Sequence, residues 1–374
     1  MQFRDLRTQY QILKPKIDTA IQNVLNEGSF IMGSQVKELE DYLAAYVGAR
    51  YCLTCANGTD ALTMVLMAWD IKAGDAVFVP DFTFFATGEA VSLMGATPVF
   101  VDVDADTFNI DPNRLENVIK ETLKIGQLKP RAIIPVDLFG LPANYPEIKK
   151  IARKYGLLIL EDGAQGFGGM LNGQRACSFG NAATTSFFPA KPLGCYGDGG
   201  AVFTNDGELA EKIESIRMHG KGNSRYDNVR IGMNSRLDTI QAAILQIKFQ
   251  AFIDYELKKV NQIAQSYSEK LKGIVKTPSI PAGYYSSWAQ YTIQLENKTQ
   301  RDTLQNKLKE QGIPSMIYYP KPMHRQSAFA ELSCTDGDYI VTEYLCDRVL
   351  SLPIHPYLEE GNILKVCKMI SSNT

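Results

Sequence analysis

The fold class is decided by residues 157–165, which read LLILEDGAQ. The four apolar residues at 157–160 precede two acids, Glu161 and Asp162, and this order predicts a short buried strand with a polar end. In open α/β sheets, ligands bind beyond the carboxyl ends of the parallel strands. An acid at this place usually faces a ligand, although Asp162 could instead cap the turn that follows it.

Similar short apolar runs recur in the first half of the chain, at residues 76–79, 98–101 and 132–136. Helix-length amphipathic stretches alternate with them. This alternation predicts an α/β fold whose mostly parallel sheet is covered by helices. Two helices are expected ahead of the sheet, because apolar residues recur at helical spacing as far as Gly28 and again as far as Gly48.

The character of the chain changes in its last third. A long helical pattern runs from about Ser235 through Leu257. Beyond it, Ala289, Tyr291, Ile293 and Leu295 alternate with polar residues, which predicts a strand with one solvated face. We therefore expect a large α/β domain with an N-terminal arm at residues 1–245, and a smaller α+β domain at residues 246–374 that begins with the long connecting helix.

The composition excludes several classes of protein. The 39 basic and 41 acidic residues among 374 give a net charge of -2, so no basic field favours nucleic acid or an anionic membrane as a partner. No apolar run is long enough to span a bilayer and the first residues do not resemble a signal peptide, so a cytoplasmic protein is expected. Metal binding is not expected, since Cys52 and Cys55 form the only close cysteine pair and the histidines are far apart.

A single lysine, Lys191, stands between two prolines in the stretch 186–206, SFFPAKPLGCYGDGGAVFTND. Two phenylalanines precede it, and a run of glycines with an acid follows it. Burial in such surroundings disfavours the charged form of the amine and lowers its pKa, which makes the amine a nucleophile toward an aldehyde. The alternative is an ordinary surface lysine on a loop.

Lys191 and Asp162 together match the needs of pyridoxal 5'-phosphate (PLP). This cofactor attaches to a lysine amine as a Schiff base and needs a carboxylate against its pyridine nitrogen, because the protonated ring is the better electron sink. Gln165 is a candidate to hydrogen-bond the ring hydroxyl. Phe84, beyond another strand end, is a candidate to stack on the ring, although aromatic residues there are also common in a core.

The phosphate of such a cofactor needs backbone donors. Residues 56–60, ANGTD, follow a strand-like run and open a helical stretch, so Gly58 and Thr59 could present amide hydrogens at a helix N-terminus. The alternative is a capped helix end without a ligand. Ser186 is a further phosphate candidate. Neither a Gly-x-Gly-x-x-Gly nor a Gly-Lys-Ser/Thr motif is present, so a nicotinamide or nucleoside-triphosphate site has no support.

At these residues the sequence resembles the DegT-type (DegT/DnrJ/StrS) sugar aminotransferases, a branch of the fold-type I PLP-dependent transferases. The resemblance covers essentially the whole chain. It rests on ANGTD at 56–60, EDGAQ at 161–165, SFFPAKPLGCYGDGGA at 186–201, HG at 219–220, GMNSRLDTIQAAIL at 232–245, YYPKPMH at 318–324 and LPIHPYL at 352–358. The resemblance implies the fold-type I architecture, PLP bound through Lys191, and L-glutamate as amino donor.

Within this family the chain is most similar to enzymes that aminate the 3-keto group of UDP-2-acetamido-2-deoxy-3-oxo-glucuronate, for bacterial surface polysaccharides such as O-antigen. An arginine directly before the His-Gly pair and a histidine before the Tyr-Pro pair are typical of that branch. Here Met218 and Tyr318 hold those positions, and Arg217 lies one residue earlier. The resemblance implies that the substrate is bound by Arg236, Tyr318, Tyr319 and His324.

The resemblance also implies a homodimer in which Asn234 of one chain reaches the cofactor phosphate of the other. Three alternatives remain open. A 3- or 4-aminotransferase of a dTDP- or UDP-linked keto-deoxyhexose would share the same core motifs. A PLP-dependent sugar dehydratase of this family has a histidine in place of Lys191, and a non-catalytic cofactor-binding regulator would not need the intact set of Lys191, Asp162 and Gln165.

Overall fold

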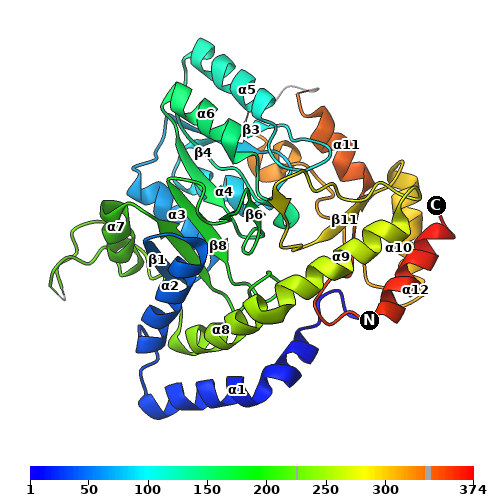
Figure 1. Ribbon diagram of the computed structural model, residues 1–374. Coiled ribbons are helices and arrows are strands. Elements are labelled where there is room, and N and C mark those ends of the chain that lie inside the picture. The colour runs from blue at the N-terminus through cyan, green and yellow to red at the C-terminus, as the bar shows by residue number, and fades with distance from the viewer. Residues whose placement is uncertain (225, 333–337) are drawn as a thin grey trace.

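The computed structural model describes residues 1–224, 226–332 and 338–374. Its centre is a sheet that has seven strands in the described part of the chain, in the order β1-β9-β8-β5-β4-β2-β3 (Figure 1). The strands are β1 (Tyr51–Cys55), β2 (Asp75–Pro80), β3 (Thr97–Val101), β4 (Lys129–Ile133), β5 (Leu158–Asp162), β8 (Ala182–Ser186) and β9 (Gly200–Thr204). Only β9 among them runs antiparallel to its neighbours. The predicted mostly parallel sheet is therefore confirmed.

Helices cover both faces of this sheet. Successive residues of a strand point to opposite faces, so the two sets of alternate residues in β2 pack against different helices. Val77 and Val79 pack on the side of α3 (Gly58–Ala68), α4 (Ala86–Leu93) and α7 (Gly207–Arg217). Ala76 and Phe78 pack on the other side, with α5 (Pro112–Ile125) and α6 (Tyr145–Tyr155). Buried strands of this kind read as continuous apolar runs, which is why the sequence revealed them.

The two N-terminal helices end where the sequence predicts. Helix α1 (Leu6–Glu27) ends at Gly28 and α2 (Ser34–Val47) ends at Gly48, with φ angles of 69° and 82°. This left-handed backbone is accessible to glycine at little cost. Leu13 and Ile17 of α1 pack against α8, so the first helix lies along the outside of the molecule (Figure 1).

The predicted long helix is also present, and its parts follow one another without a break. It consists of α8 (Thr239–Ala251), a π-helical turn (Phe252–Glu256) and α9 (Leu257–Leu271). It crosses the molecule from the sheet side to the C-terminal part (Figure 1). Among the described residues, none of the helices is both long enough and apolar enough to cross a bilayer.

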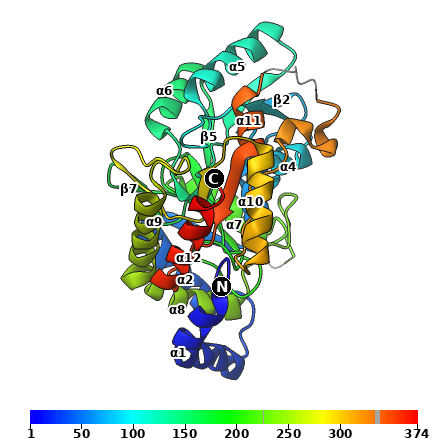
Figure 2. The ribbon, with the colours of Figure 1, turned by 90° about the vertical axis from the view of Figure 1, so that its right-hand side faces the viewer.

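The C-terminal part has a hydrophobic cluster of its own, formed by residues between 260 and 370. It contains β11 (Tyr291–Gln294) paired antiparallel with β12 (Val349–Leu352), next to α10 (Lys298–Glu310), α11 (Ile340–Arg348) and α12 (Glu360–Ser371) (Figure 2). A small sheet, β6 (Met170–Leu171), β7 (Gln174–Arg175) and β10 (Tyr284–Tyr285), connects this part to the first. The division near residue 245 stays a prediction.

The prediction of a solvated face for the strand around Tyr291 is wrong. Every residue of β11 is buried. Thr292 is within hydrogen-bond distance of the Ser351 hydroxyl, at 2.8 Å, and the Gln294 side chain donates to the carbonyl of Ala105 at 2.8 Å. The Thr292 hydroxyl and the Gln294 amide nitrogen therefore find partners inside the protein that are remote in the sequence.

Candidate active site

The predicted site residues gather at one edge of the sheet. Strands β1, β2, β5 and β8 run parallel to one another, so their carboxyl ends meet at this edge. The loops that leave these ends carry Gly58, Phe84, Asp162 with Gln165, and Ser186 with Lys191. The topology thus brings together residues that are more than 130 positions apart in the sequence.

Lys191 lies in the loop between β8 and β9, where its backbone N–H donates to the carbonyl of Phe188 at 2.9 Å. Its amine makes no hydrogen bond within residues 1–224, 226–332 and 338–374. Burial lowers the pKa of this amine, an effect that the Asp162 carboxylate opposes and the positive charge of Arg4 reinforces. The structure therefore gives Lys191 the lowered proton affinity that a nucleophilic amine needs.

Asp162 is the last residue of β5, and its side chain is only 5% exposed. One carboxylate oxygen accepts a hydrogen bond from the Thr87 hydroxyl at 2.9 Å and the other accepts from the backbone N–H of Ala164 at 3.2 Å. Burial raises the pKa of Asp162, while these two donors and Lys191 act in the opposite direction. Thr87 was missed from the sequence, although it lies three residues beyond Phe84 in the same PDFTFFAT segment.

Gln165 connects two distant segments beside Asp162. Its side chain donates to the Tyr319 hydroxyl at 3.1 Å and accepts from the backbone N–H of Phe139 at 2.8 Å. The Tyr319 ring centroid lies 6.5 Å from that of Phe84. Phe84 is 56% exposed, so much of its ring remains uncovered for a flat ligand.

The N-terminus of α3 provides two amide donors next to Ser186. Asn57 caps this helix by accepting from the backbone N–H of Asp60 at 2.8 Å. The N–H groups of Gly58 and Thr59 have no acceptor among the residues that the structure describes. A Cβ atom at Gly58 would lie 2.8 Å from the Cβ of Ser186, so glycine permits the close approach of the Ser186 hydroxyl to this helix end. The arrangement suits an anion.

His324 and Tyr318 lie beside this group but have other contacts. The ring nitrogen Nδ1 of His324 is 2.6 Å from a carboxylate oxygen of Asp81, and the ring stacks on Tyr339 at 4.3 Å between centroids. The His324 side chain is only 6% exposed. Tyr318 meets Phe3 edge to face at 6.3 Å. Their substrate-binding roles stay predictions.

Arg217 is not available to a substrate. Its side chain is 3% exposed and donates to Glu40 at 2.6 Å and to the carbonyl of Thr54 at 2.7 Å, and it also pairs with Glu214. These contacts tie α7 to α2 and β1. Arg217 therefore does not replace the arginine expected at Met218.

Asn234 and Arg236 lie in the segment before α8. Asn234 is exposed and accepts a hydrogen bond from Arg236. Between them, the hydroxyl of buried Ser235 accepts from the backbone N–H of Ala56 at 3.1 Å, just ahead of α3. Within the described part of this chain, no contact joins Asn234 or Arg236 to Lys191.

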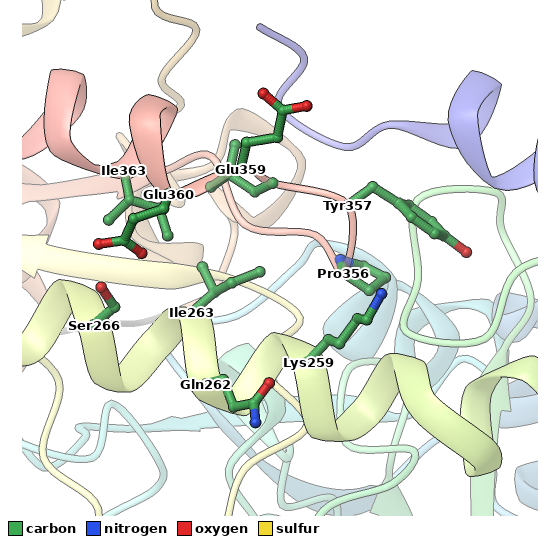
Figure 3. Close-up of a pocket in the computed structure, with 10 residues that line it drawn as sticks. Lys259, Gln262, Ile263, Ser266, Pro356, Tyr357, Glu359, Glu360 and Ile363 are labelled. Carbon is green, nitrogen blue, oxygen red and sulfur yellow. The ribbon is translucent and has the colours of Figure 1, made fainter.

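A surface hollow of about 400 Å³ lies between α9 and the segment before α12 (Figure 3). Lys259, Gln262 and Ser266 line it on the helix side, and Pro356 to Glu360 line it on the other. None of these is a predicted site residue, so the hollow is not part of the candidate site.

Comparisons with known proteins identify the family of this chain. The model of the DegT/DnrJ/EryC1/StrS aminotransferase family matches residues 11–371. The chain is 46% identical over 375 residues to the UDP-2-acetamido-2-deoxy-3-oxo-D-glucuronate aminotransferase of Pseudomonas aeruginosa, with 100% of both chains covered. It is 43% identical over 367 residues to the UDP-N-acetyl-3-dehydro-alpha-D-glucosamine 3-aminotransferase of Acidithiobacillus ferrooxidans, which covers 98% of this chain and 96% of the relative.

A solved structure confirms the α/β fold. The crystal structure of a DegT DnrJ EryC1 StrS aminotransferase from Brucella abortus is 52% identical in sequence and superposes with a TM-score of 0.97, covering 100% of this chain and 99% of that chain. The chain belongs to the DegT/DnrJ/EryC1/StrS aminotransferase family.

Proposed function

We propose that this protein is a PLP-dependent aminotransferase that transfers the amino group of L-glutamate to the 3-keto carbon of UDP-2-acetamido-2-deoxy-3-oxo-glucuronate. The observation that carries the proposal is the placement of Lys191 and Asp162 together at the carboxyl ends of β8 and β5, where burial lowers the pKa of the lysine amine and the Asp162 carboxylate opposes this effect.

The residues present fit PLP. A lysine amine without a hydrogen bond suits the aldehyde, and a buried carboxylate suits the pyridine nitrogen. The unpartnered amides of Gly58 and Thr59, with the adjacent Ser186 hydroxyl, suit the phosphate. Phe84 would cover the ring and Gln165 would hydrogen-bond its hydroxyl. When bound, PLP supplies an electron sink for the negative charge left by loss of a proton from carbon.

The chain's own residues divide the remaining work. Lys191 would hold the cofactor through its amine; once released, that amine would remove the proton from the α-carbon of glutamate in the first half-reaction and deliver a proton to carbon 3 of the sugar in the second. Thr87 and the N–H of Ala164 donate to the two oxygens of Asp162, and these hydrogen bonds favour its ionised form toward the ring. Thr87 thus acts through Asp162 as a positioning residue.

The two candidate sugars are distinguished by the carboxylate that a glucuronate carries and a glucosamine lacks. Both relatives are named for UDP-linked 3-keto sugars, and only the Pseudomonas name specifies a glucuronate. Its full-length identity of 46% supports a uronate here. Since Arg217 is held by Glu40 inside the protein, Arg236 is the arginine that we assign to an anionic group of the substrate.

We further propose a homodimer in which Asn234 and Arg236 complete the site of the partner. They follow the loop after α7, where Val229 is 55% exposed and Ile231 is 86% exposed. Apolar side chains on a projecting loop are typical of a protein contact surface. A cytoplasmic enzyme that supplies amino sugars for a surface polysaccharide such as O-antigen fits this proposal.

A panel of keto nucleotide sugars offered with glutamate tests the function. The informative pair is the 3-oxo-glucuronate and the 3-oxo-glucosamine UDP sugars, which differ only at carbon 6. A dTDP-linked keto-deoxyhexose is the third substrate, and product mass and ring-carbon position are the readouts. We expect the uronate to react fastest, at carbon 3. A faster reaction of the glucosamine sugar would overturn the uronate assignment, and no amination of any sugar would overturn the function.

A further inference from the structure

The N-terminal segment reaches the loop that carries Lys191. Arg4 precedes α1, and one nitrogen of its guanidinium donates to the carbonyl of Lys191 at 2.8 Å and to the carbonyl of Pro192 at 3.3 Å. The two partners are 187 residues apart in the sequence. Backbone carbonyls in a loop need hydrogen-bond donors from outside the loop. The contact with Arg4 supplies one, and it holds the backbone in place at Lys191 and Pro192.

The segment around Arg4 is itself held at both ends. On one side, Phe3 packs edge to face on Tyr318, which neighbours Tyr319 of the candidate site. On the other side, the Asp5 carboxylate caps α1 by accepting from the backbone N–H of Thr8 at 2.9 Å. Arg4 is therefore part of a fixed structure rather than of a loose chain end.

A buried acid provides the counter-charge for Arg4. Glu256, in the π-helical turn, is 4% exposed, and one of its oxygens accepts from Gln9 at 2.8 Å and from Tyr357. Figure 3 shows the Tyr357 side chain turned away from the nearby surface hollow. Burial lowers the pKa of Arg4 to about 10 while Glu256 and Tyr357 oppose the effect, so the guanidinium stays charged at neutral pH.

We propose that Arg4 is a positioning residue for Lys191, which holds the backbone of the lysine loop and places a permanent positive charge near the amine. This inference rests on the proposed role of Lys191 as the residue that binds PLP. A second cation near the amine disfavours its protonated form, so Arg4 helps to keep Lys191 reactive. One guanidinium nitrogen serves both carbonyls, and the planar head of arginine holds that nitrogen in place, whereas a lysine ammonium is carried on a flexible four-carbon stem.

Three variants separate the two effects. Arg4→Met removes the charge and the donors, and Arg4→Lys keeps the charge but replaces the planar guanidinium with a flexible ammonium group. Arg7→Met is the matched control, because Arg7 is exposed on α1. The first readout is the pH dependence with which acetic anhydride labels Lys191 in the cofactor-free full-length protein, measured by mass spectrometry relative to exposed Lys16. The second readout is the rate at which each protein captures PLP from solution.

In Arg4→Met we expect the midpoint of Lys191 labelling to move up by about half a unit to one pH unit, with slower capture of PLP. In Arg4→Lys we expect the midpoint of Lys191 labelling to stay near that of the wild type, because the charge is kept. The rate of PLP capture should nevertheless be lower than in the wild type. Arg7→Met should match the wild type in both. An Arg4→Met protein that matches Arg7→Met in both readouts overturns the proposal.

If circular dichroism shows that Arg4→Met does not fold, Arg4→Lys provides the test. A rate of PLP capture in Arg4→Lys equal to that of the wild type then overturns the proposed role of Arg4. The labelling experiment needs no cofactor. A wild-type protein that fails to attach PLP to Lys191 would refute the proposed function, whereas the labelling midpoint would still report on Arg4.

Discussion

Replacement of Asp162 by asparagine should separate catalysis from stability. The side chain is 5% exposed, and burial raises the pKa of its carboxyl group above the ordinary value. An acid with a raised pKa binds its proton more tightly in the folded protein than in the unfolded chain. The free energy of unfolding therefore falls as the pH rises from the pKa of Asp162 in the unfolded chain through its pKa in the folded protein, so ionisation of this carboxyl is a cost to the cofactor-free fold.

The size of the effect follows from the two hydrogen bonds of Asp162. The amide of asparagine has one acceptor oxygen, so it can serve either the Thr87 hydroxyl or the N–H of Ala164, and the loss of one such bond costs about 1 kcal/mol. Removal of the buried charge offsets part of this. We expect the free energy of unfolding to change by no more than about 1 kcal/mol. The rate should fall about 100-fold or more, as when a group that stabilises developing charge is lost.

Urea unfolding of the cofactor-free protein and the rate of the glutamate half-reaction measure these two quantities. If Asp162→Asn lost more than about 3 kcal/mol of stability while its folded fraction reacted at the wild-type rate, Asp162 would be a structural residue and not the carboxylate that supports the cofactor ring.

Glu161→Gln is the matched control, because Glu161 precedes Asp162 on β5 and points to the opposite face. Glu161 is fully buried and accepts from the backbone N–H groups of Cys177 and Phe179. Glutamine can serve only one of them, so we expect a loss of about 1–3 kcal/mol with turnover per folded molecule retained. Burial raises the pKa of Glu161 from 4.5 to about 7, so wild-type stability should fall as the pH rises across this window, and the variant should show less of this fall.

Three further predictions concern other parts of the molecule. Arg217→Met should destabilise the protein by about 3–5 kcal/mol, because it leaves Glu40 buried without its partner; an unfolding midpoint in urea equal to that of the wild type would contradict this. Arg236→Ala should raise the KM for the sugar and spare the glutamate half-reaction, and equal damage to both half-reactions would remove its assignment to the sugar. A hybrid dimer of a Lys191→Ala chain with an Asn234→Ala, Arg236→Ala chain should regain activity at one of its two sites; a hybrid no more active than its parents would show that each chain builds its site alone.

Local patterns predicted the fold well because they follow from local physics. Helices α1 and α2 end at Gly28 and Gly48, where the backbone turns left-handed, and this conformation is a preference of glycine itself. The apolar runs of the central strands are likewise visible in the residues of each strand alone. The solvated face predicted around Tyr291 failed because Thr292 and Gln294 find partners in Ser351 and Ala105, and no local pattern contains those partners.

In the candidate site, too, local features were predicted from the sequence and contacts between remote residues were not. Asp162 and Lys191 were predicted from strand-end position and from unusual surroundings. Thr87 and Arg4 were not predicted, because their importance lies in contacts with residues 75 and 187 positions away. The sequence left the role of Arg217 open, because its partner Glu40 is 177 residues away in the chain.

Borohydride reduction identifies the lysine that binds PLP, because it makes the bond between a lysine amine and PLP permanent. Lys248 is the informative rival, since burial lowers its pKa to about 8 and its amine has no hydrogen-bond partner in the described part of the chain. Peptide mass mapping of the reduced protein should place the phosphopyridoxyl group on Lys191, and Lys191→Ala should abolish both the label and turnover. A label on Lys248, or on any other lysine, would contradict the assignment of Lys191 as the residue that binds PLP.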